Sequence, residues 1–334
     1  KTCSISGNAF VGAIGGTNGS GDVYISCIGN EGNVTGTAQN VCGILGTDWY
    51  GEATLHISDC YVTGTIKGAR ESATICGWSS ASSRIENCYS IASLEGIYET
   101  GSFTRGQGYV SNSYEIEGVG VQAGVAKVTA QDVANGILCY KLNSPAFGQL
   151  IGTDLHPVFG GPEVSYVGDA GYATLYDTTT GYELNGDVEA YVAVLNSTWL
   201  DLNKVENIPA GTPVVLEGTY YNKIAAELPA LNVANDLKGT DAATTADGTM
   251  YVLAKVDDQV GFYKAEGTIP AGKAYYQSTS GAKAFFFNGE DATGISEVES
   301  SKLKVESSIY NIAGQRLQKM QKGINIINGK KVLK

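Results

Sequence analysis

The sequence predicts an all-β protein in which a right-handed parallel β-helix is followed by a β-sandwich and a small C-terminal β module. The first observation is a repeat: a strand-like phrase ending in glycine, Ile57–Gly68, returns through the first third of the chain. The second is a shorter phrase, an apolar pair followed by glycine, which lies between those copies. The third is composition, because 44 glycines against 7 prolines favour strands joined by tight turns.

Residues 1–125 are predicted to form the β-helix. Other copies of the first phrase are Ile25–Gly36, Ile85–Gly96 and Ser111–Gly118, and Lys1–Gly7 resembles the end of another. The second phrase occurs at Phe10–Ile14, Val41–Gly46 and Ile75–Trp78. One repeat of roughly 25 to 33 residues cannot bury its apolar side chains alone, but stacked copies can. Each strand then pairs with its equivalent one coil away, about 4.8 Å along the axis.

Six of the seven cysteines lie in this repeat region. Cys27, Cys60 and Cys88 are predicted to form one interior stack, and Cys42 and Cys76 a second. A disulfide framework uses irregular spacings in a small domain, so the regular spacing indicates free, buried thiols. A zinc site is excluded because no Cys-x-x-Cys pair exists.

Glycines at the ends of the phrases are predicted to occupy corners of the coil, where a residue with positive φ is required. These corner glycines are Gly36, Gly64, Gly68 and Gly96.

The alternation of the two phrases, as in Cys60–Gly64 and Gly43–Gly46, resembles the GLUG-motif repeats of secreted and surface proteins of gut Bacteroidetes. The resemblance covers roughly residues 1 to 120. It implies a β-helical surface protein of the kind described as an adhesin.

Residues 126–160 are predicted to be a capping helix and a linker. Apolar residues between Val128 and Asn143 recur with helical spacing, Thr129 provides an N-cap with Asp132 three residues later, and Pro145 follows the end of the helix. We expect this helix to close the open end of the solenoid core. The following segment, 147–159, resembles the one that ends GLUG-type arrays and places a boundary near residue 160.

Residues 161–296 lose the repeat, and short strands alternate there with turn residues, which predicts a β-sandwich. Seven strands are expected, at Tyr172–Tyr176, Glu189–Leu195, Thr212–Leu216, Met250–Ala254, Gly261–Lys264, Lys273–Gln277 and Lys283–Phe287. The tetrapeptide Ile208–Gly211 recurs as Ile269–Gly272, each time before a strand, which indicates two equivalent turns and a duplicated unit. The stretch resembles β-rich modules of Bacteroidetes surface proteins.

Residues 297–334 form the last predicted module. Asn328-Gly329 is a hairpin turn between Ile324–Ile327 and Lys331–Leu333. The segment resembles the C-terminal sorting module of exported Bacteroidetes proteins, and this resemblance implies a secreted or outer-membrane-associated protein.

The net charge and the positions of residues that could act in catalysis limit the classes of function that we expect. A net charge of −12 argues against nucleic acid or an anionic membrane surface as a partner, and no apolar run is long enough for a membrane span. Polysaccharide lyases and hydrolases built on β-helices need grouped carboxylates, whereas Asp22, Asp48 and Asp59 fall at different repeat positions. His56 and His156 have no neighbouring nucleophile. We therefore expect no catalytic residue, metal or cofactor.

The favoured function is non-catalytic binding or adhesion to glycans or host surface molecules. The candidate binding residues are aromatic side chains suited to stacking on sugars: Trp49, Tyr50, Trp78 and Tyr98. Two alternatives stay open, a polysaccharide-degrading enzyme or its accessory module, and a structural spacer. Carboxylates converging in a groove would favour the enzyme, and an exposed aromatic patch would favour the carbohydrate binder.

Overall fold

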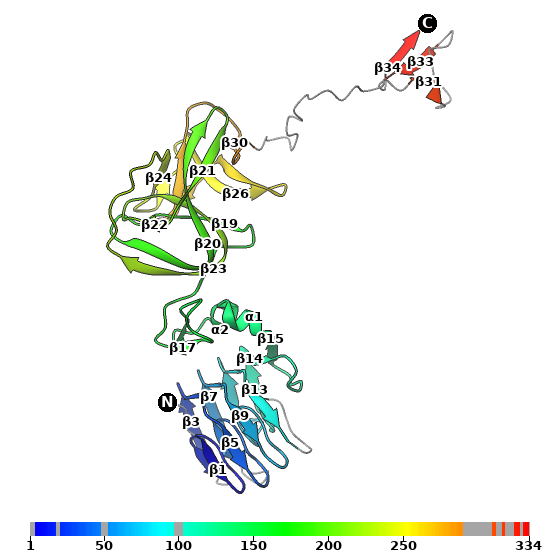
Figure 1. Ribbon diagram of the computed structural model, residues 1–334, viewed down its shortest axis with the longest axis vertical. Coiled ribbons are helices and arrows are strands. Elements are labelled where there is room, and N and C mark those ends of the chain that lie inside the picture. Colours follow the sequence, from blue (N-terminus) through cyan, green and yellow to red (C-terminus); the bar gives the residue numbers. More distant parts are fainter. Residues whose placement is uncertain are drawn as a thin grey trace. The chain divides into compact units, whose positions relative to one another are not determined.

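The computed structural model describes residues 4–17, 21–47, 53–96 and 103–289, together with four short strands near the C-terminus (Figure 1). The protein is nearly all β, with about 49% strand and 4% helix. It divides into two compact units, Lys1–Asn288 and Gly289–Lys334.

The first part is a solenoid of about three turns, as the repeat predicted. Its three main walls are parallel sheets. The first contains β1 (Ile5–Gly7), β5 (Val34–Gly36), β9 (Thr65–Lys67) and β12 (Ser93–Glu95). The second contains β3 (Gly21–Ser26), β7 (Ala53–Ser58), β10 (Arg84–Glu86) and β13 (Tyr109–Ser111). The third contains β4 (Gly29–Asn30), β8 (Tyr61–Val62), β11 (Tyr89–Ser90), β14 (Ser113–Ile116) and β15 (Val125–Val128).

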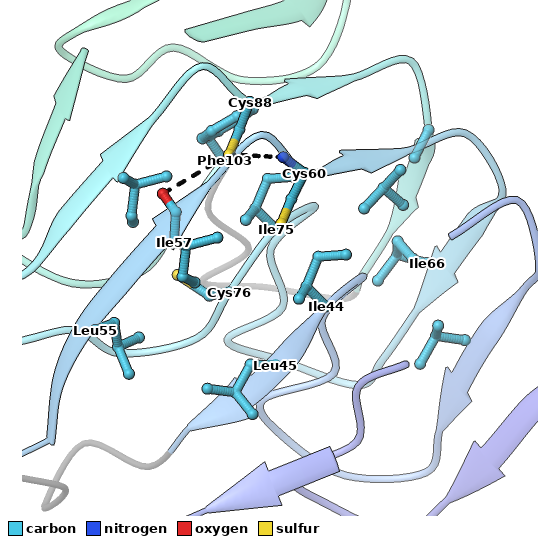
Figure 2. Close-up of a cluster of buried hydrophobic side chains, with 14 of the residues drawn as sticks. Ile44, Leu45, Leu55, Ile57, Cys60, Ile66, Ile75, Cys76, Cys88 and Phe103 are labelled. Atoms are coloured by element: carbon cyan, nitrogen blue, oxygen red, sulfur yellow. Dashed lines mark hydrogen bonds between the residues drawn. The ribbon is translucent and has the colours of Figure 1, made fainter. Parts of the chain in front are cut away.

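The interior is filled by apolar side chains that lie above one another in successive coils (Figure 2). In the second wall, Ile25, Ile57, Ile85 and Val110 are partners in register. A short fourth pair, β2 (Gly15–Thr17) with β6 (Leu45–Thr47), and single bridges such as Cys76 with Thr104 complete the coil. Because one strand face is buried, a shift of one residue would turn the apolar side chains outward, so the register is strongly specified.

The predicted cysteine stacks are wrong in register, although the thiols are free. Cys60 and Cys88 are buried and aligned, but the first coil places Ile28 in this column and leaves Cys27 exposed. Cys27 instead occupies the corner position of Asp59, where the backbone has positive φ. The other pair also differs, since Cys42 aligns with Ala73 and Cys76 with Leu45. The prediction failed because each repeat has a corner residue between two strand segments. The spacing of the cysteines does not show whether a cysteine occupies that corner or the position after it.

The Cys60 column also does more than fill space. The Cys60 N–H donates to Cys88 Sγ at 3.4 Å, and the Cys88 N–H donates to Ser113 Oγ at 3.2 Å (Figure 2 shows the first). Each side chain in turn donates to a carbonyl two residues earlier, as Cys88 Sγ does to Glu86 O at 3.1 Å. A small side chain with a donor and an acceptor therefore satisfies buried backbone groups at each corner, which explains how Ser113 replaces cysteine in the last copy.

The predicted glycine corners have a different role. Non-glycine corners with positive φ form two columns, Cys27, Asp59, Asn87 and Asn112 in one and Phe10, Asn40 and Glu71 in the other. Gly64 and Gly68 lack positive φ, and an added Cβ would lie 2.1 Å from Gly32 O at the first and 2.2 Å from Ser72 Oγ at the second. These glycines allow neighbouring backbone and side chains to approach closely. Asp and Asn tolerate the left-handed conformation better than most residues, and so they can occupy the corners.

The last coil is fixed by a buried carboxylate. Glu115 is fully buried on β14, where Lys127 Nζ of β15 lies 2.9 Å from its Oε2 and Thr74 Oγ1 donates to its Oε1 at 2.9 Å. A charge buried in this way requires such partners.

The segment after the solenoid forms two helices, because Gly136 adopts positive φ and interrupts the predicted one. The helices are α1 (Ala130–Ala134), with the predicted Thr129–Asp132 capping box, and α2 (Ile137–Leu142). Rather than joining the interior cluster at its open end, they pack with Tyr61 and Tyr89 on the outer side of the third wall. We call this side, which carries Tyr61, Tyr89 and Tyr114, the tyrosine face. The hairpin β16 (Phe147–Gly148) and β17 (Val158–Phe159) covers it as well.

Residues 165–287 form two antiparallel sheets that share one hydrophobic cluster. The first contains β18 (Ser165–Tyr166), β19 (Tyr172–Leu175), β20 (Gly181–Asn196), β21 (Trp199–Val205), β22 (Asn207–Ile208) and β23 (Val214–Ala226). The second contains β24 (Leu237–Gly239), β26 (Met250–Val256), β27 (Gln259–Lys264), β29 (Ala274–Gln277) and β30 (Ala284–Phe285). A further pair consists of β25 (Thr244–Thr245) and β28 (Thr268–Ile269).

The two sheets repeat one topology, in agreement with the predicted duplication. The order β19-β23-β20-β21 in the first sheet matches β24-β29-β26-β27 in the second. The turns before β23 and β29 are also equivalent, since Gly211 and Gly272 have φ of 77° and 76°. All seven predicted strands are present, and β21 is the main addition.

In the C-terminal unit, β31 (Ile309–Asn311), β32 (Arg316–Leu317), β33 (Ile324–Ile327) and β34 (Lys330–Leu333) form an antiparallel sheet. The pairing of Ile327 with Lys330 gives the predicted two-residue hairpin connection.

Candidate binding face of the solenoid

The outer side of the second wall carries one column of aromatic and cationic residues. Tyr24, His56, Arg84 and Tyr109 are partners in register on β3, β7, β10 and β13. Each immediately precedes the buried aliphatic residue of its strand, and because side chains alternate along a strand, each points away from the core. We call this surface the ladder face.

Neighbouring members of the column stack on each other. The rings of Tyr24 and His56 are parallel, with 4.4 Å between centroids and 6° between planes. The Arg84 guanidinium carbon lies 5.6 Å from the centroid of the Tyr109 ring. Aromatic stacking thus orders Tyr24 with His56, and cation–π attraction orders Arg84 with Tyr109.

Backbone contacts hold Arg84 in place. Its Nη1 donates to Ser83 O at 2.9 Å and to Ser82 O at 3.2 Å, in the turn that precedes β10. Arg84 is exposed, so its guanidinium offers further donors in a rigid fork. The guanidinium is therefore positioned before any ligand arrives.

The ladder face is exposed. Tyr24 is 72% exposed and Tyr109 is 60% exposed, whereas Tyr61 and Tyr89 on the tyrosine face are almost completely buried. A hollow of about 310 Å³ lies along the column and includes the hydroxyl groups of Ser26 and Ser58 and the carboxylate of Glu86. Asp22 adds a second carboxylate, 3.8 Å from His56 Nε2. The surface thus combines ring faces, a fixed cation and hydroxyl and carboxylate groups, which are the groups that bind a polar, hydroxylated ligand.

The interior thiols differ in their pKa: a hydrogen bond with Cys88 lowers the pKa of Cys60, whereas Cys76 and Cys88 are poor nucleophiles. Burial raises the pKa of the Cys76 thiol to about 12 and raises that of Cys88 well above its ordinary value. In Cys76 and Cys88 the thiol rather than the thiolate is present at neutral pH, and the thiol is a poor nucleophile. Among the described residues, no three His, Cys, Asp or Glu side chains are grouped so that they could hold a metal ion.

The structure places only one of the four predicted binding residues. Trp78 is half-buried, and the Arg105 guanidinium carbon lies 4.8 Å from the centroid of its ring, so one ring face is covered. Trp49, Tyr50 and Tyr98 lie outside the described residues. His56, for which the sequence showed no neighbouring nucleophile, is in the ladder.

Sequence reasoning did not identify the ladder, although its signal is present. The residue before Ile25, Ile57, Ile85 and Val110 is aromatic or cationic in every copy. Aligning the copies on these aliphatic positions, rather than on the cysteines, brings the four residues into one column. The search for tryptophan in loops missed it because the column is built on strands.

No known protein family matches the chain, and no curated protein or solved structure is similar to it. In the part of the chain that the structure describes, no helix has both the length and the apolar character needed to cross a membrane.

Proposed function

We propose that this chain is a non-catalytic binding or adhesion protein and that its ladder face recognises an extended glycan. The observation that carries the proposal is the exposed column of Tyr24, His56, Arg84 and Tyr109, which stacks on itself without covering by any described segment. Exposed aromatic residues in an ordered row are uncommon on a surface that has no partner.

The geometry suits a polymer better than a single small molecule. Equivalent residues recur at the strand spacing of about 4.8 Å along the solenoid axis. A sugar unit in an extended polysaccharide has a similar length, so successive units can meet successive rungs. The outer ring faces of Tyr24 and Tyr109 are available for the apolar side of a sugar ring. Arg84 and the serine hydroxyls supply hydrogen bonds to hydroxyl or carboxylate groups.

The remaining assignments belong to the same proposal. The resemblance to GLUG repeats and to a sorting module supports a secreted or outer-membrane-associated bacterial protein that contacts glycans or host surface molecules. The solenoid is then right-handed, the two antiparallel sheets are a β-sandwich, and residues 297–334 direct export. Trp49, Tyr50, Trp78 and Tyr98 would extend the aromatic surface.

A polysaccharide array tests the proposal directly. The full chain is applied to immobilised neutral and uronate-containing polysaccharides, and affinities for positive probes are measured by titration calorimetry. We expect Arg84→Ala and Tyr109→Ala each to weaken binding by about tenfold or more, since each removes a contact that the bound ligand would desolvate. Lys67→Ala is the matched control, because Lys67 is an exposed cation on the first wall of the solenoid.

Two results would contradict the proposal. Absence of binding across the array would favour the spacer, and binding that is insensitive to Arg84 and Tyr109 would place the site elsewhere. Release of reducing ends or unsaturated sugars from a bound polysaccharide would favour the enzyme.

A further inference from the structure

The two antiparallel sheets of residues 165–287 meet along two seams that the internal duplication relates to each other. In the first sheet Val215 pairs with both Thr174 and Tyr191, and in the second sheet Tyr276 pairs with both Leu237 and Tyr251. Thr174 is therefore equivalent to Leu237, and Tyr191 is equivalent to Tyr251. Counting along the strands makes Ala193 and Leu195 the equivalents of Leu253 and Lys255.

The first seam is closed by hydrogen bonds. Asn235 and Asp236, just before β24, lie along β20 beyond the point where its pairing with β23 ends. The Asp236 N–H donates to Ala193 O at 2.8 Å. The Leu195 N–H donates to Asp236 Oδ2 at 2.7 Å, and the Ala193 N–H donates to Asn235 Oδ1 at 3.3 Å. A short piece of chain thus completes the edge of β20.

The second seam is open. β29 pairs with β26 only as far as Val252, so no described strand continues the sheet beside Lys255. The Ala265 N–H donates to Met250 O, which shows that Met250 and the alternate residues direct their backbone groups toward β27. Because these directions alternate along an antiparallel strand, the Leu253 N–H belongs to the last rung with β29, and the Leu253 carbonyl and the backbone groups of Lys255 point to the open side.

A pocket of about 390 Å³ occupies this open side, between β19 and β26. Its apolar lining comes from both sheets and includes Ala173, Val252, Ala254 and Ile269. Charged groups line it as well: Lys255, Lys273 and Glu266. Lys255 also lies 3.1 Å from Asp258, whereas Lys273 has no ion-pair partner among the described residues.

We propose that the open seam binds an extended peptide segment from a partner protein, which adds as a short strand to the free edge of β26. The Leu253 carbonyl and the Lys255 N–H would then be paired as the Ala193 carbonyl and the Leu195 N–H are in the closed seam. Strand addition supplies affinity through main-chain hydrogen bonds, and a side-chain pocket supplies specificity. The apolar pocket selects an aliphatic or aromatic residue, and Lys255 and Lys273 select a nearby acidic one, corresponding to Asp236 in the closed seam.

Hydrogen–deuterium exchange on the full chain tests the premise. The amide of Lys255 should exchange at least about tenfold faster than that of Leu195, because only the latter is bonded. Equal protection at the two seams would overturn the proposal, since the edge of β26 would then already be occupied.

A peptide selection tests the binding itself. Phage-displayed random heptapeptides are selected on the immobilised full chain, and enriched peptides are synthesised and titrated by fluorescence anisotropy. Lys255→Pro removes the N–H on the open side and should weaken binding about tenfold, whereas Lys255→Ala keeps that N–H, removes only an exposed charge and should weaken binding less than Lys255→Pro does. Ala254→Trp fills the pocket and should also weaken binding more than about tenfold.

Ala226→Trp is the matched control, because Ala226 lines a different hollow on β23. It should leave peptide binding unchanged. Thermal melting establishes that each variant is folded. The hydrogen–deuterium exchange test uses the unsubstituted chain, so it does not depend on the folding of any variant. Failure to enrich any peptide, or binding that tolerates both Lys255→Pro and Ala254→Trp, would overturn the proposal. Neither result bears on glycan binding at the ladder face, so the two proposals fail separately.

Discussion

The tyrosine face and the ladder face carry similar side chains in similar stacks, but only one of them is covered. Tyr61 and Tyr89 stack with 5.2 Å between centroids and 6° between planes, much like Tyr24 and His56 on the other wall. Tyr89 is completely buried beneath the β16–β17 hairpin and donates to Pro157 O, whereas Tyr24 is 72% exposed. A repeating coil produces such a column on any wall, and the covering segment decides whether the column stabilises the protein or remains available to a ligand.

Removal of a buried tyrosine should have the largest effect on the free energy of unfolding. A small effect would contradict the difference between the two faces. Tyr89→Ala deletes a fully buried ring and its hydrogen bonds to His156 Nδ1 and Pro157 O, so it should lower the free energy of unfolding by about 3–5 kcal/mol. Tyr24→Ala should change it by less than about 0.5 kcal/mol, because its ring is exposed. Urea denaturation of both variants measures the difference. Similar losses in the two would mean that the ladder is a structural element as well.

The corner between the second and third walls is stabilised by the column that contains Cys60 and Cys88. Cys88→Ala leaves the Cys60 N–H without its acceptor inside the core and should lower the free energy of unfolding by about 1–3 kcal/mol. Cys88→Ser keeps an acceptor and a donor, as Ser113 does one coil later, and should cost less. Chemical denaturation again provides the measurement. Equal losses would show that Cys88 acts only through its volume.

Alkaline titration should report whether the tyrosine face is covered in solution. Burial and a hydrogen bond to Glu31 raise the pKa of Tyr61 to about 12. An unfolded tyrosine ionises near pH 10, so between about pH 10 and 12 the unfolded state loses the proton first, and stability falls as pH rises. Below about pH 10 this contribution is fully present. Absorbance at about 295 nm, compared between the intact chain and Tyr61→Phe, follows the ionisation. Ionisation of Tyr61 near pH 10 would mean that the tyrosine face is not covered in solution.

The solenoid was the most predictable part, because a repeat states the same structural requirement several times. The strands and free thiols of the solenoid followed from local patterns. The capping box of α1 and the duplicated turns before β23 and β29 did so as well. Register did not follow, because Cys27 and Cys60 look equivalent by spacing while the chain places a left-handed corner at Cys27. The position of the helices was also unpredictable, since an amphipathic helix can pack on an open end or on a wall with equal local signals. The ladder and the open seam arise from strand partners far apart in sequence, which spacing alone does not reveal.

At the corner between the ladder face and the tyrosine face, we expect differences in thiol reactivity and no effect on stability. Asp59 is partly buried at this corner, where Ser144 Oγ donates to its Oδ1 at 2.6 Å. Cys27, in the same column, is exposed. N-ethylmaleimide should therefore modify Cys27 in the folded chain, while Cys42, Cys60, Cys76, Cys88 and Cys139 react only in denaturant, which peptide mass spectrometry can follow. A cysteine placed at Asp59 in a Cys27→Ser background is the matched variant and should react more slowly than Cys27. If it reacts equally fast, the covering segment leaves that corner open, and burial of the tyrosine face rests on the hairpin alone.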